Sequence, residues 1–211
     1  MNAIETTHAH VAANVAAAGD WLTGHDRVAA WREARDAETN ETDRARRSAI
    51  SPNAVPGHAT PTIEVVHRVA SDPGRLTRTW ADEQIAALGE ETYTELVGVT
   101  AIASVLDTFD RAMGRPEPTI PEPIDGEPAR VRPDDVGDVG AWVSQTTGPT
   151  RANVSRTLSL VPETNRLWRQ LVDTFYSRGT EFMNLSWDFP LSRPQAELIA
   201  ARTTALNECF Y

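Results

Sequence analysis

The chain is poor in cysteine and has no lysine. Its 211 residues contain one cysteine, Cys209, and all 20 basic residues are arginine. A single cysteine excludes a disulfide within the chain and is typical of a reducing compartment, so we expect a cytoplasmic protein. Acidic residues outnumber basic ones by 30 to 20, and the net charge is −10. A nucleic-acid partner is therefore not expected, because phosphate binding requires clustered positive charge.

Long apolar runs, strand-like alternation and the common catalytic motifs are also missing. The alanine-rich run 10–19 is too short to span a bilayer and lacks the basic residues of an export signal, so no membrane partner is expected. No glycine-rich phosphate loop, nucleophile elbow or paired-histidine zinc motif occurs. With 40% apolar residues the chain can nevertheless bury a core. Because helical periodicity dominates, we predict an all-α fold.

Changes in composition divide the chain into four predicted parts. These are an N-terminal helical and irregular extension (1–59), a helical block (60–114), a linker (115–140) and a second helical block (141–211). The linker is predicted from six prolines, which favour an extended segment or a strap on the outside: Pro116, Pro118, Pro121, Pro123, Pro128 and Pro133. The clearest helices are predicted at about 91–113 and 162–176.

The histidines suggest two candidate sites. His8, His10 and His25 could form a metal site, but no carboxylate or cysteine lies at ligand spacing, so we favour a frayed N-terminus. His67 lies within the apolar stripe of a helix predicted to start at Thr60. It is a candidate general base. A lone histidine in such a stripe is more often a packed side chain with one hydrogen bond, and we favour packing.

The C-terminal stretch contains the strongest local signals. Ser192 and Gln195 form a capping-box pair, which predicts a helix from there to about Leu206. Asn207 is a preferred N-cap, and a new helix beginning there places Cys209 in its first turn. Free amides and the helix dipole at such a position lower the pKa of a thiol and favour the thiolate.

The same stretch resembles a known family. The phrase L-S-R-P-Q-A-E-L-I-A-A-R-T-T-A-L-N-E-C is similar to the run that leads into the active site of the alkylhydroperoxidase AhpD-like branch of the carboxymuconolactone decarboxylase superfamily. That site has the pattern E-x11-C-x2-C-x3-H, and Glu197 with Cys209 matches its first half. Looser similarity to the two-lobed members of the family extends back to about Trp31. The second cysteine and the histidine would fall at positions 212 and 216, after Tyr211.

The resemblance implies an AhpD-like helical fold and an antioxidant thiol peroxidase without metal, haem or other cofactor. In this family one thiol is oxidised by a hydroperoxide, a second resolves the product as a disulfide, and the glutamate and histidine relay protons. The attacking thiol is the second of the pair, so the resemblance gives Cys209 the resolving role and Glu197 a proton-relay role. The implied partners are a small hydroperoxide and a thiol reductant protein. Family members usually associate, and the apolar faces at 96–109 and 167–175 also favour a homo-oligomer.

A weak internal repeat accompanies this pattern. Shifted by 102 residues, Glu95 lies on Glu197 and Asp107 on Cys209, while Asp110 lies on position 212. The spacing E-x11-D-x2-D copies the family pattern without its thiols, so we interpret the first helical block as a degenerate lobe. The three acidic residues are catalytic candidates by analogy, but we favour the alternative that they form a solvated helix face.

Other interpretations stay open. A lone cysteine is often an inert small apolar residue, although its spacing from Glu197 and the family phrase favour a redox role. The chain is alternatively a cofactor-free carboxymuconolactone decarboxylase or a non-catalytic helical subunit. We expect a second redox residue after Tyr211. An in-frame UGA codon read as selenocysteine, which we favour, a frameshift or a truncation would each give the same 211 residues.

Overall fold

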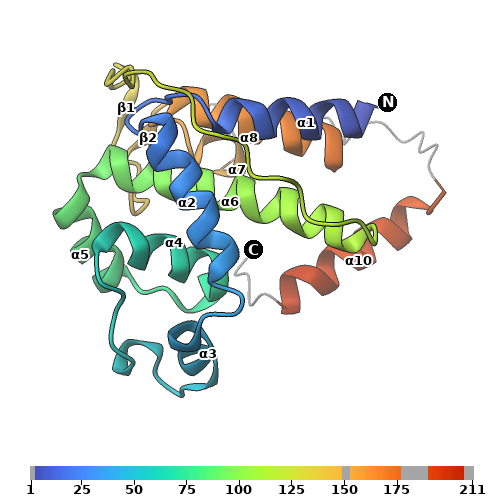
Figure 1. Ribbon diagram of the computed structural model, residues 1–211, viewed down its shortest axis with the longest axis horizontal. Helices are drawn as coiled ribbons and strands as arrows, with labels where there is room; N and C mark the ends of the chain where they lie inside the picture. The colour runs from blue at the N-terminus through green and yellow to red at the C-terminus, as the bar shows by residue number, and fades with distance from the viewer. Residues whose placement is uncertain (1–2, 149–152, 177–189, 207–211) are drawn as a thin grey trace.

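The computed structural model describes residues 3–148, 153–176 and 190–206. Within these ranges the chain is mostly helical and contains one small antiparallel sheet, so the predicted all-α class is confirmed (Figure 1). None of the helices in these ranges combines the length and the apolar character that a membrane span requires.

The described residues form nine α-helices. They are α1 (Ala3–Val15), α2 (Gly24–Asp36), α3 (Glu41–Ser48), α4 (Pro61–Ser71), α5 (Arg78–Leu88), α6 (Glu90–Ala112), α7 (Asn153–Arg156), α8 (Pro162–Phe175) and α10 (Arg193–Leu206). Two 3-10 turns occur at Pro52–Ala54 and Pro73–Arg75. Strand β1 (Val136–Gly137) pairs with β2 (Gln145–Thr146), with Val136 opposite Thr146. The predicted helices 91–113 and 162–176 correspond to α6 and α8, each end within one residue.

Local sequence determines where several helices begin. Four of them start at a polar residue whose side chain accepts a hydrogen bond from an amide of the first turn: α2 at Thr23, α3 at Asn40, α4 at Thr60 and α5 at Thr77. Such caps satisfy amides that have no partner inside the helix and contribute about 1 kcal/mol each. Gly89 separates α5 from α6 with a φ of 83°, which glycine adopts without strain.

Helix α6 is central to the fold. It packs against α1, α2, α4, α5 and α8, which surround it in Figure 1. Its buried apolar side chains are Leu96, Val99, Ile102, Ala103 and Leu106. They meet Trp31 of α2, Val66 of α4 and Leu167 of α8 in one apolar cluster. Burial of each such side chain stabilises the fold by about 1.5–3 kcal/mol. The core therefore contains helices from both sides of the predicted linker.

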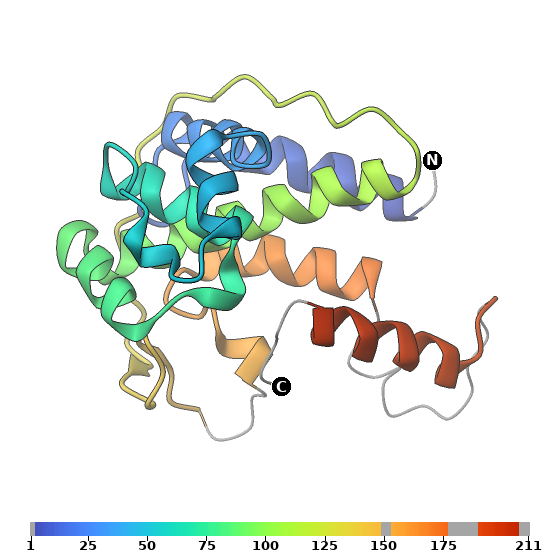
Figure 2. The same cartoon turned by 90° about the horizontal axis from the view of Figure 1, so that it is seen from below.

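The proline-rich segment forms a strap on the outside. Residues 115–133 have no helix or strand and run past α1 and α2, as Figure 2 shows. Backbone hydrogen bonds attach the strap to the turn between these helices, from Ile124 N to Ala16 O at 2.8 Å and from Arg130 N to Asp20 O at 2.7 Å. Proline disfavours regular structure here, and these few bonds fix the path of the strap.

Helix α10 lies at the edge of the molecule in both views (Figures 1 and 2). None of its described residues is buried, and Leu198 and Leu206 are 70% and 65% exposed. The Ser192 amide donates to Gln195 Oε1 at 2.8 Å, so this half of the predicted capping box is confirmed. The large apolar side chains of α10 are therefore mostly exposed within the described chain.

Candidate functional site

The predicted redox residues lie at and beyond the end of the described chain. Glu197 is on α10, with its carboxylate 3.7 Å from the Arg193 guanidinium and a side chain that is 44% exposed. Asn207 and Cys209 lie outside the described residues. The pairing of Glu197 with Cys209 therefore stays a prediction.

The three acidic residues of α6 are buried, and the expectation of a solvated helix face was wrong. Glu95, Asp107 and Asp110 are 0%, 5% and 8% exposed. The physical reason is that neighbouring helices cover α6 on several sides, so even its polar positions face protein. A polar helical stripe in a sequence does not distinguish a face in water from a buried face that meets hydrogen-bond partners.

Glu95 is the centre of a buried network. Its carboxylate accepts hydrogen bonds from the amides of residues 20–22, at 3.2, 2.5 and 3.0 Å, and from Thr164 Oγ1 at 3.2 Å. The guanidinium of Arg27, 2% exposed, lies 3.5 Å away. Burial raises the pKa of Glu95 and lowers that of Arg27, although each opposes the shift of the other. Both oxygens are engaged by the protein, so the network holds α2, α6 and α8 together and leaves no acceptor for a substrate.

Asp107 and Asp110 attach neighbouring helices to α6. Asp107 accepts from Trp31 Nε1 at 3.1 Å and from two nitrogens of Arg35 at 2.7 and 3.0 Å. Asp110 lies 3.3 Å from His8 Nε2, which ties α1 to the end of α6. These contacts indicate a structural role for both carboxylates.

The three N-terminal histidines are not brought together. His8 contacts Asp110, His10 is exposed beside Asn14, and His25 pairs with Asp125 at 2.9 Å. The expectation of a frayed N-terminus was also wrong for residues 3–15, which form α1 and pack against α8. The reason is tertiary, because Val11 and Val15 of α1 enter the core.

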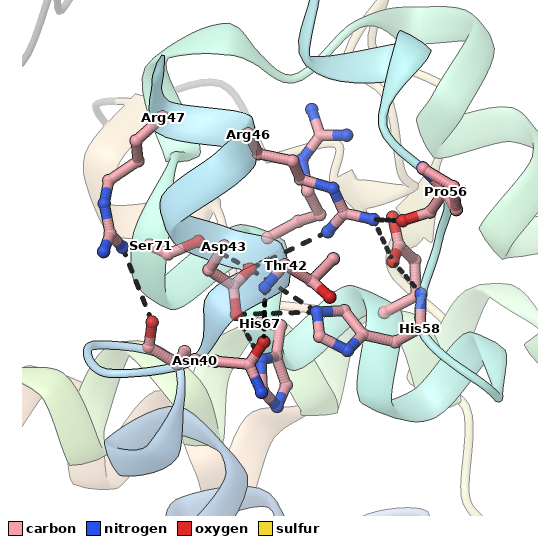
Figure 3. Close-up of polar contacts among 12 residues, drawn as sticks. Asn40, Thr42, Asp43, Arg46, Arg47, Pro56, His58, His67 and Ser71 are labelled. Atoms are coloured by element: carbon pink, nitrogen blue, oxygen red, sulfur yellow. Dashed lines mark hydrogen bonds and ion pairs between the residues drawn. The ribbon is translucent and has the colours of Figure 1, made fainter. Parts of the chain in front are cut away.

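A different group of titratable side chains meets between α3, α4 and the loop 49–60 (Figure 3). It consists of Asp43 on α3, His67 on α4 and His58 on the loop, and their ligand atoms all lie within 4.8 Å of one another. Asp43 and His67 are 0% and 1% exposed, and the His58 side chain is 10% exposed. In the part of the chain that the structure describes, this is the group that could hold a metal ion.

His67 has two carboxylate partners. Its burial agrees with the predicted packed side chain, but the expectation of one hydrogen bond was wrong. Nδ1 lies 2.5 Å from Asp43 Oδ2, and Nε2 lies 2.9 Å from Glu33 Oε2 on α2. Burial lowers the pKa of His67, but the two carboxylates outweigh it and hold the pKa above its ordinary value of 6.5. With both ring nitrogens engaged, His67 is a poor general base.

Asp43 is equally constrained. Burial raises the pKa of its carboxyl, yet the hydrogen bond from His67 and the nearby His58 outweigh burial and hold the pKa below its ordinary value. Ser71 Oγ donates to Oδ1 at 3.1 Å, and Arg46 is 3.8 Å from the same oxygen. The carboxylate is therefore oriented on both of its oxygens.

Hydrogen bonds from Arg46 and to Glu64 hold the loop that carries His58. Arg46 donates to Pro56 O at 3.1 Å and to Glu64 Oε2 at 2.8 Å, and Glu64 Oε2 also accepts from the His58 amide at 2.8 Å. The ring of His58 then lies over that of His67, with centroids 4.0 Å apart. Figure 3 shows both rings directed toward Asp43.

A polar cavity of about 470 Å³ borders this group. Arg46, His58 and Glu64 contribute to its wall, together with Arg68 and Trp80. The guanidinium of Arg68 is 5.2 Å from the Trp80 ring centroid, a cation–π distance. The mixture of charges suits a small polar ligand better than an apolar one.

The sequence interpretation missed Asp43, His58 and Glu33 as site residues. Residues 36–59 are polar and weakly periodic, which predicted only an irregular extension. The only available signal was a pair of histidines, His58 and His67, nine positions apart and flanked by carboxylates. That signal does not reveal that a loop folds back over α3 and α4.

Comparison with protein-family models, with curated proteins and with solved structures gives no match. The resemblance to the AhpD-like family therefore depends on the sequence phrase that ends at Cys209 and stays a prediction.

Proposed function

We propose that the chain is a thiol- or selenol-dependent alkyl hydroperoxide reductase of the AhpD-like type, with Glu197 and Cys209 in its active site. The observation that supports this most directly is the solvent exposure of the Glu197 carboxylate. The phrase that resembles the family forms a helix from Arg193, and on it Glu197 has a partly exposed carboxylate whose ion-pair partner among the described residues, Arg193, is 3.7 Å away. An accessible carboxyl group is free to exchange a proton with a substrate, unlike the buried Glu95.

The proposed reaction has two steps. A thiolate or selenolate, from the second redox residue that the family pattern implies, attacks the outer oxygen of the hydroperoxide. The O–O bond breaks, and the alkoxide takes a proton from Glu197 and leaves as the alcohol. The Cys209 thiolate then attacks the oxidised sulfur or selenium, hydroxide leaves as water after protonation, and a disulfide or selenenyl sulfide forms.

The cycle requires an external reductant. A thiol reductant protein would reduce the new bond and restore both groups, so we place the protein in the cytoplasm, where such reductants are present. No cofactor enters this reaction, because the sulfur or selenium itself carries the two electrons.

Peroxide consumption by a chain extended with a cysteine at position 212, where the family pattern places the attacking thiol, tests the proposal. With cumene hydroperoxide and a thiol reductant protein, we expect turnover that Cys209→Ser abolishes, because the oxidised thiol then has no resolving partner. Glu197→Gln should slow it by roughly 10²- to 10⁴-fold, the usual contribution of a general acid. Glu163→Gln is a matched control, because Glu163 is exposed and pairs with an arginine 3.0 Å away. Activity that survives in Cys209→Ser contradicts the proposal.

A second candidate is a non-catalytic subunit of a helical homo-oligomer. The observation that favours it is the row of exposed apolar side chains on α10, Leu198, Ile199 and Leu206, on a helix with no buried residue. Inertness toward both hydroperoxide and carboxymuconolactone would favour this candidate. Turnover of the lactone alone would favour a cofactor-free decarboxylase.

A further inference from the structure

The cluster of Asp43, His58 and His67 has the composition of a transition-metal site. Two imidazoles and one carboxylate are ligands that Zn²⁺ prefers, and three protein ligands leave a fourth position for solvent or substrate. The three residues come from α3, the loop 49–60 and α4. Both histidines direct a ring nitrogen toward the same buried carboxylate, that of Asp43.

The distances fit one ion. Ligand atoms around a tetrahedral Zn²⁺, with bonds of about 2.0–2.2 Å, are separated by roughly 3.3–3.5 Å. His58 Nε2 lies 3.5 Å from each carboxylate oxygen of Asp43. The His67 Nδ1 to Asp43 Oδ2 distance of 2.5 Å is that of a hydrogen bond. A metal ion would replace the proton of this hydrogen bond, and the distance between the two atoms would increase by about 1 Å.

The surrounding groups orient the ligands as metal sites require. A histidine that binds a metal usually donates its other ring N–H to a carboxylate. His67 has this arrangement, since Nδ1 faces Asp43 and Nε2 contacts Glu33 at 2.9 Å. Ser71 Oγ holds Asp43, and the bond from the His58 amide to Glu64 holds the loop. The ligands are therefore held close to their binding positions before an ion arrives.

The local charge also favours a cation. Asp43 and Glu33 both contact His67, and Arg46 is the only arginine within 4.0 Å of the Asp43 carboxylate among the described residues. The guanidinium of Arg46 makes its shorter contact, 2.8 Å, with Glu64. A dication bound at Asp43 would therefore experience little repulsion from neighbouring positive charges.

We propose that Asp43, His58 and His67 bind one divalent transition-metal ion, Zn²⁺ by ligand type. The proposal shares no residue with the peroxidase proposal and does not depend on it.

Titration of the full chain with ZnCl₂ tests the site. The purified protein is treated with EDTA, desalted and titrated by isothermal calorimetry. We expect one Zn²⁺ per chain. His58→Ala should lower the affinity at least tenfold, and Glu33→Gln should lower it by about 10- to 100-fold, because Glu33 orients a ligand without binding the ion. Both side chains lie partly at the surface, so both variants should keep the helical circular-dichroism spectrum of the parent.

A matched control and a second probe make the result decisive. His25→Ala removes an exposed histidine that also pairs with a carboxylate, and it should bind Zn²⁺ like the parent. Co²⁺ should give the visible absorption of a tetrahedral complex in the parent and in His25→Ala but not in His58→Ala. Absence of stoichiometric Zn²⁺ binding overturns the proposal, and so does equal affinity in the parent and His58→Ala, or an equal loss in His25→Ala.

Discussion

Replacement of Glu95 by glutamine is the sharpest test of the fold. The substitution keeps the size of the side chain and removes its charge. The amide oxygen of glutamine can still accept from the backbone of residues 20–22. The NH₂ group, however, replaces a carboxylate oxygen that accepts hydrogen bonds in the parent, and NH₂ cannot accept them. It also leaves the guanidinium of Arg27, 2% exposed, without its carboxylate.

The expected cost follows from these contacts. Breaking a buried ion pair by removing one partner destabilises a protein by about 3–5 kcal/mol. Loss of a hydrogen bond to a charged group, at about 1.5–3 kcal/mol, is part of the same cost and is not added to it. We therefore expect Glu95→Gln to lower the free energy of unfolding by about 3–5 kcal/mol. For a chain of this size the melting temperature should fall by about 6–20 °C.

Urea denaturation followed by circular dichroism measures the change. The control is Glu197→Gln, the same substitution at the position that the predicted repeat aligns with Glu95. Its exposed ion pair with Arg193 should contribute less than about 1 kcal/mol. The double variant Glu95→Gln, Arg27→Met should lose less stability than the two single variants together, because the uncompensated charge is gone. A loss below about 1 kcal/mol in Glu95→Gln would refute the network, and additive losses would refute the ion pair.

Three further predictions concern other contacts. Burial raises the pKa of Glu90, but its bonds from Ser144 and Arg132 outweigh burial and hold the pKa below its ordinary value of 4.5. The ionised Glu90 therefore stabilises the fold above pH 4.5, and this stabilisation is lost as the pH falls through the folded-state pKa. In urea denaturation, the difference in free energy of unfolding between the parent and Glu90→Gln should decrease as the pH is lowered. Trp31→Phe should cost about 1–3 kcal/mol, because it removes the buried indole N–H bonded to a carboxylate at 3.1 Å, and thermal denaturation measures this. The chain should be a homo-oligomer by light scattering at micromolar concentration and dissociate on Leu198→Glu, whereas a monomeric parent would contradict this.

Much of the secondary structure could be predicted because its signals are local. A helix cap involves residues two or three apart, and an apolar stripe repeats within a single helix. Thr60, the stripe of α8 and the proline-rich strap were therefore sufficient to locate α4, α8 and the segment 115–133. None of these signals requires knowledge of which helices become neighbours.

The candidate metal site could not be predicted from the sequence in this way. Asp43 lies 15 residues before His58 and 24 before His67, and only the packing of α3 and α4 with the returning loop joins them. Glu33 belongs to yet another helix, 34 residues from His67. Long-range contacts of this kind depend on chain topology, which periodicity within one element does not contain.

The sequence by itself determined that the chain forms helices, where many of them begin and which segment becomes an outer strap. Only the tertiary structure decided what the polar residues of those helices do. Glu95 and Glu197 have the same residue type and similar helical surroundings in the sequence, yet one is 0% exposed and the other has a side chain that is 44% exposed. The physical reason is that a helix specifies its own hydrogen bonds, whereas the solvation of each side chain depends on the neighbours that tertiary packing places around it.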